Sequence, residues 1–189
     1  MANLIVVLML IVFGATHLAG QTSVSDLKPS HAAALKGYLS EHQDRSFRQE
    51  TILSEDYLKS FRNEEGFGKS FKPNYSAADF NGDGSEDFAV LLNREGKEEW
   101  PEELEEGQRT HSEHFPDHPL TLLVFNGIKG GKFRLAFSKD LMGPNAAFIN
   151  LETRRRKKVL YYGIFESDAD TFSLSPAGRG YAISSERPD

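Results

Sequence analysis

The stretch "ADFNGDGSEDFAVLL", residues 78–92, joins an acidic, glycine-containing segment directly to five consecutive apolar residues. The apolar residues 88–92 have the length and composition of a strand that is buried on both faces. The negative charges that precede them repel one another, so the turn is either solvated or holds a cation. Four carboxylates lie within the nine residues 79–87: Asp79, Asp83, Glu86 and Asp87.

The apolar pattern continues through the C-terminal half of the chain. Residues 120–125 are also apolar on both faces, which predicts a second central strand. Residues 132–138 alternate between larger apolar side chains and other residues, and the connection "NGIKGG", residues 126–131, predicts a hairpin. Four further strands are expected at residues 145–151, 158–165, 172–174 and 180–184.

Two helices are expected before these strands. Residues 27–43 carry apolar side chains at helical spacing and begin with Pro29 and Ser30, which are helix start signals. Residues 54–62 form a weaker candidate. The sequence therefore predicts an α+β fold, with N-terminal helices packed on an antiparallel meander sheet of about 5–7 strands.

Residues 1–20 differ in composition from the rest of the chain. They contain no charged side chain, and residues 4–13 are an unbroken apolar run. This run suits the apolar region of a signal peptide and is shorter than the ~20 residues that span a bilayer. We expect export to a secreted or periplasmic location, with no stable membrane span after cleavage; an uncleaved anchor is the alternative.

The remaining residues, 21–189, are expected to form a single domain. A chain of this length buries about 70% of its unfolded surface, so it needs no disulfide, and the sequence contains no cysteine. Its formal net charge of −6 argues against nucleic acid as a partner. A polar insertion is expected at about residues 94–118, between two central strands.

The acidic segment has the spacing of a calcium loop, D-x-N-x-D-G-x-x-D. Calcium takes six to eight oxygen ligands, and alternate residues of a tight loop direct their side chains inward. Gly84 permits a sharp turn at the sixth position. Ser85 would contribute its backbone carbonyl, and Asp87 would act directly or through water. The candidate metal ligands are Asp79, Asn81, Asp83, Ser85 and Asp87.

The segment is not an EF-hand, because the twelfth position is Val90 inside a predicted strand. It resembles instead the calcium loops of FG-GAP and VCBS-type repeats, here as a single copy in what resembles a small exported bacterial protein. The resemblance covers residues 78–92 and implies a calcium site between two strands. Those loops normally recur, whereas this one occurs once, so the adhesion role of the repeats is not carried over. The alternative is a metal-free turn rich in Asp, Asn and Gly.

Histidines in the polar insertion form a second candidate metal site. A catalytic zinc needs three protein ligands, and this segment contains three histidines that could supply them: His111, His114 and His118. Imidazoles also bind copper. Pro116 and Pro119 interrupt any helix that would align the three rings. A solvated insertion without metal is therefore the favoured interpretation of this segment.

Two functions are consistent with these observations. The first is an exported non-enzymatic domain with one structural calcium ion, acting as a cell-envelope or extracellular binding module for an unknown protein or glycan. The alternative is a metal-dependent hydrolase that uses His111, His114 and His118. Since no pair of carboxylates with distinct acid and base environments is evident, the sequence favours the first function over an enzyme.

Overall fold

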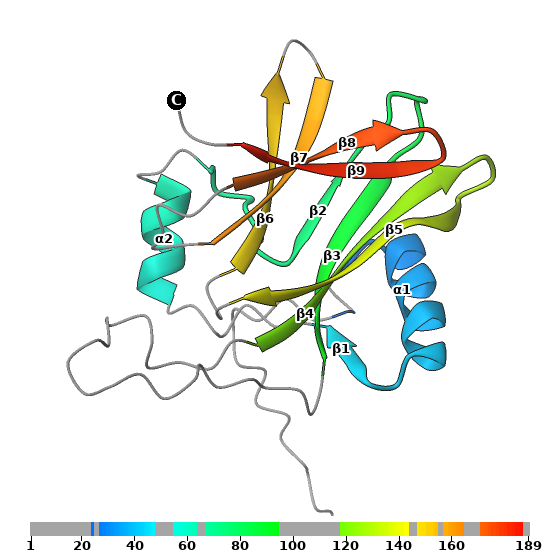
Figure 1. Ribbon diagram of the computed structural model, residues 1–189, viewed down its shortest axis with the longest axis horizontal. Coiled ribbons are helices and arrows are strands. Elements are labelled where there is room, and N and C mark those ends of the chain that lie inside the picture. The colour runs from blue at the N-terminus through cyan, green and yellow to red at the C-terminus, as the bar shows by residue number, and fades with distance from the viewer. Residues whose placement is uncertain are drawn as a thin grey trace, which may run out of the picture.

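The computed structural model describes residues 24, 27–47, 55–63, 67–94, 118–143, 147–154, 157–164 and 171–186 (Figure 1). In this part of the chain, none of the helices is both long and apolar enough to span a membrane. The elements are α1 (Pro29–Glu41), β1 (Arg45–Phe47), α2 (Glu55–Asn63), β2 (Tyr75–Ala78), β3 (Asp87–Arg94), β4 (His118–Ile128), β5 (Lys132–Gly143), β6 (Ala147–Arg154), β7 (Lys157–Ile164), β8 (Thr171–Ala177) and β9 (Gly180–Glu186).

The described strands form two antiparallel sheets. The first has the order β1-β3-β4-β5, and β2 pairs with β3 beside β1. The second has the sequential order β6-β7-β8-β9. The predicted hairpin between β4 and β5 is confirmed, although its turn is shorter than expected, because residues 126–128 continue the pairing of β4.

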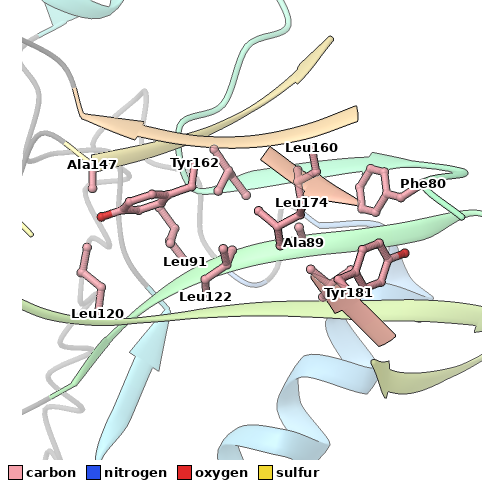
Figure 2. Close-up of a cluster of buried hydrophobic side chains, with 12 residues drawn as sticks. Phe80, Ala89, Leu91, Leu120, Leu122, Ala147, Leu160, Tyr162, Leu174 and Tyr181 are labelled. Carbon is pink, nitrogen blue, oxygen red and sulfur yellow. The ribbon is translucent and has the colours of Figure 1, made fainter. Parts of the chain in front are cut away.

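The single meander expected from the sequence is therefore wrong, while the antiparallel pairing is confirmed. The chain divides its strands between two sheets, and each sheet presents an apolar face that the other buries. Figure 2 shows Leu160 and Leu174 of the second sheet facing Ala89 and Leu122 of the first. Tyr181 of β9 lies at the edge of the same cluster and is also buried.

The other face of the first sheet is covered by α1. Phe88 and Val90 of β3 point toward this helix and pack with its Leu35, which is fully buried. Residues 88–92 are thus apolar and buried on both faces, as their composition predicts. The second helix does not pack beside α1 as expected. Phe61 of α2 packs instead against Phe71 and Phe148, in a separate cluster from the one that contains Leu35.

Candidate cation-binding loop

The acidic loop connects β2 to β3 at the open end of their ladder, where Ala78 lies opposite Asp87. Gly82 and Gly84 have φ angles of 77° and 85°. Side chains with a Cβ atom rarely adopt this left-handed conformation, so the two glycines allow the chain to reverse here. The sharp turn expected at Gly84 is confirmed.

The carboxylate of Asp79 lies at the centre of this loop. Its Oδ1 accepts hydrogen bonds from the backbone N–H groups of Gly82 and Asp83, at 2.7 and 3.1 Å. Its Oδ2 accepts a third from the N–H of Gly84, at 2.9 Å. The loop is therefore curled around Asp79 by its own backbone donors.

Asn81 and Asp83 lie side by side on the exposed part of the loop. The Asn81 Nδ2 donates to Asp83 Oδ2 at 3.1 Å, and the Asp83 N–H donates to Asn81 Oδ1 at 2.8 Å. The N–H of Ser85 donates to Asp83 Oδ1 at 2.8 Å. This last bond is the main reason why the pKa of Asp83 is lowered, so the carboxylate is held in its charged form.

Asp87 has a different environment, because its side chain is fully buried. Its Oδ2 accepts from the N–H of Phe80 at 2.9 Å, and its Oδ1 accepts from the N–H of Gly127 at 2.9 Å. The hydroxyl of Tyr181 lies 3.4 Å from Oδ2 and 2.8 Å from Asn126 Oδ1, so it bonds mainly to Asn126. Asp87 thus connects the acidic loop to β4 and, through Tyr181, to the second sheet.

Burial raises the pKa of Asp87, while the backbone N–H groups that donate to it oppose this rise. Burial also raises the pKa of Tyr181, followed by the nearby charge of Asp87. The rise in both pKa values reflects the low polarity of the space between the sheets. The N–H donors are what make a charged Asp87 tolerable there, because they replace the water that the carboxylate has lost.

The structure therefore separates the five predicted ligands into two groups. Asp79, Asn81 and Asp83 come together in the exposed loop, and their oxygens retain lone pairs beyond those used internally. Ser85 lies beside them, and its N–H donates to Asp83. Asp87 is directed inward. Across the described ranges, no group of three or more His, Cys, Asp or Glu side chains is arranged to hold a metal ion.

The partners of Asp87 were not predicted from the sequence. Gly127 and Tyr181 lie 40 and 94 residues away in the chain. Gly127 forms part of the glycine-containing segment assigned to a hairpin, and Tyr181 belongs to a short strand at the expected edge of the sheet. No local pattern links either residue to the acidic loop.

A second buried polar group lies beside the loop, at His31 of α1. Its Nε2 lies 3.2 Å from Glu86 Oε1, and its Nδ1 lies 2.7 Å from the Tyr75 hydroxyl. Glu86 also accepts a hydrogen bond of 2.7 Å from Lys28 Nζ. The His31 ring stacks on Phe88, with 4.4 Å between the ring centroids. These contacts join α1 to the residue that follows Ser85.

The contacts of His31 assign the tautomer of its neutral form. Glu86 accepts hydrogen bonds only, so a neutral His31 carries its proton on Nε2 and accepts at Nδ1. Tyr75 donates that second bond, since burial and the charge of Glu86 raise its pKa to about 12. Burial lowers the pKa of His31, although Glu86 opposes the change.

We expect the protein to lose stability as the pH falls below about 6.5, the ordinary pKa of histidine. In this range unfolded His31 binds a proton more readily than buried His31, so acid favours the unfolded state. Urea unfolding at pH 7.5 and 5.5 measures the effect. His31→Gln should lower the stability at both pH values and reduce the difference between them. His42→Gln, at a half-buried position, is the control; an unchanged pH dependence in His31→Gln contradicts the assignment.

The histidine candidate site is not placed by the structure. His111 and His114 lie outside the described residues, as do residues 1–20 and most of the predicted insertion. His118 is the first residue of β4.

Comparison with known proteins finds no matching family model, no matching curated protein and no matching solved structure.

Proposed function

We propose that this protein is an exported, non-enzymatic binding domain in which the loop at residues 79–87 holds one structural calcium ion. The main supporting observation is the curled backbone around Asp79, whose carboxylate accepts three hydrogen bonds from the loop. This conformation places Asn81 and Asp83 in contact. A loop that is already folded loses little conformational entropy when it binds an ion.

In this proposal Asp79, Asn81 and Asp83 provide side-chain oxygens, and Ser85 provides its backbone carbonyl. Asp87 fixes the base of the loop through Phe80 and reaches the ion only through water, because its side chain is buried. The ion would supply positive charge that offsets the repulsion between the exposed carboxylates. The residues would thereby hold the end of the β2–β3 hairpin in one conformation.

The remaining parts of the proposal rest on the sequence. The uncharged residues 1–20 support export to a secreted or periplasmic location. The net charge of −6 disfavours nucleic acid as a partner, and the partner we propose is a protein or glycan of the cell envelope. Extracellular calcium modules commonly bind the ion with a Kd of only about 10⁻⁴–10⁻³ M, which suits an ion with a structural role.

Calcium is expected to stabilise the purified protein. At a concentration near 100 times Kd the gain is about 2.7 kcal/mol, which corresponds to a rise in Tm of several degrees for a domain of this size. Thermal unfolding should be followed in EDTA and in 10 mM calcium. Asp83→Asn should remove most of the rise, because it deletes the charge of one ligand and retains its shape.

Glu152→Gln, on the exposed part of β6, is the matched control and should respond to calcium like the parent protein. Magnesium at the same concentration should have a smaller effect, since it prefers a tighter octahedral shell. Equal rises for calcium in the parent and Asp83→Asn would exclude the loop as the site. No rise at all would leave it a metal-free turn.

A further inference from the structure

A cavity of about 350 Å³ lies where residues 67–72 meet β2 and β6. This volume is at the lower end of the range for small-molecule sites, roughly 300–1,000 Å³. One part of its wall is apolar and includes Phe67, Phe71 and Leu151. Another part is polar and includes Lys72 and Asn150. The cavity therefore combines the two kinds of surface that bind and orient a small organic molecule.

The described lining of the cavity carries positive charge. Lys28 and Lys72 both contribute to it, and none of the described lining residues is acidic. Lys28 is paired with Glu86, which lies outside the lining. Lys72 Nζ lies 5.9 Å from the centroid of the Tyr75 ring, and it forms no ion pair with any other described residue. The ammonium group of Lys72 is thus available to a negatively charged ligand.

The walls of the cavity are held by the core of the protein. The Tyr75 hydroxyl is fixed by its 2.7 Å hydrogen bond to buried His31. The residues between Lys72 and Tyr75 are anchored on both sides, because the carbonyl of Pro73 accepts from Ile149 N–H at 2.8 Å and the carbonyl of Asn74 accepts from Leu91 N–H at 3.1 Å. A site supported in this way is formed before the ligand arrives.

We propose that this cavity binds a small organic anion, with the negative group at Lys72 and the apolar body against Phe71 and Leu151. An apolar surface gives such a ligand a place to bury its body, and the lysine selects for its charge. The inference is independent of the calcium loop, because none of the five candidate metal ligands lines the cavity.

Benzoate is a suitable probe, and benzyl alcohol is its uncharged counterpart. Titrations of the ¹⁵N-labelled protein in EDTA should follow the backbone amide signals. We expect benzoate to shift the signals of residues 70–77 and 150–151 in a saturable manner. Benzyl alcohol should bind at least tenfold more weakly. Equal binding of the two compounds would overturn the proposal of an anion site.

Two substitutions test the location of the site. Lys72→Gln removes the positive charge of the site. Asn150→Asp introduces a negative charge on a side chain of nearly the same shape. Each substitution should weaken benzoate binding at least tenfold. Lys69→Gln is the matched control, because Lys69 is exposed and does not line the cavity. The amide spectra themselves report whether each variant is folded. The proposal would be overturned if a folded variant bound benzoate as tightly as the parent protein. It would also be overturned if benzoate shifted only the amide signals of other parts of the surface.

Discussion

Asp87→Ala is expected to lower the free energy of unfolding by about 3 kcal/mol or more. The buried carboxylate accepts hydrogen bonds from Phe80 and Gly127, and the hydroxyl of Tyr181 lies nearby. Alanine leaves the N–H groups of Phe80 and Gly127 inside the protein without this acceptor, and each buried donor without a partner costs about 1–3 kcal/mol. The loss should therefore exceed that of an ordinary surface substitution several-fold.

Urea unfolding in EDTA, followed by circular dichroism, measures this loss without any contribution from bound metal. Glu152→Ala is the control, since an exposed glutamate is expected to change the stability by no more than about 0.5 kcal/mol. Tyr181→Phe should give an intermediate loss, because it removes one hydroxyl that bonds to Asn126. If Asp87→Ala were as stable as Glu152→Ala, the buried position of the carboxylate would be incorrect.

Gly127→Ala is expected to be the second strongly destabilising substitution. A Cβ atom at this position would overlap the backbone carbonyl oxygen of Glu86, which cannot move aside as a flexible side chain can. Relief of the overlap requires β4 to separate from the acidic loop, which also lengthens the hydrogen bond from Gly127 N–H to Asp87. Overpacking of this kind costs about 1–3 kcal/mol, and we expect the upper part of that range.

Gly37→Ala provides a control of opposite sign. Gly37 lies inside α1, and a Cβ atom added there would meet no atom within 4 Å. Alanine is favoured over glycine inside a helix by roughly 0.5–1 kcal/mol, so this variant should be slightly more stable than the parent. Both variants are compared by urea unfolding. A Gly127→Ala variant as stable as the parent would contradict the close approach of β4 to the loop.

These two predictions concern the contact that ties the acidic loop to the rest of the molecule. Asp87 belongs to the same nine-residue motif as Asp79, yet the two carboxylates have different roles. Asp79 organises the exposed loop through neighbouring backbone groups, whereas Asp87 accepts both from Phe80 of the loop and from Gly127 of the distant strand β4. A loss of stability in Asp87→Ala therefore does not test calcium binding, which is why the calcium experiment uses Asp83→Asn.

Most local elements of this protein follow from short-range patterns in the sequence. Residues 88–92 and 120–125 are buried strands as their mainly apolar character predicted, since a strand covered on both faces has apolar side chains on both of its sides. The turn at Gly82 and Gly84 also follows from local chemistry, because glycine readily accepts a positive φ. The first helix was predicted at residues 27–43 and lies at Pro29–Glu41. Strand β1 was missed, because three residues are too few to show a period.

The grouping of these elements depends on contacts between distant parts of the chain. Alternating side chains identify a strand with one apolar face, but not which other strands will cover that face. For this reason the sequence did not predict the division into two sheets, the buried partners of Asp87 or the cavity beside Lys72. Each depends on residues brought together from distant parts of the chain, such as Asp87 and Tyr181, and they meet only when the apolar faces of the two sheets pack together.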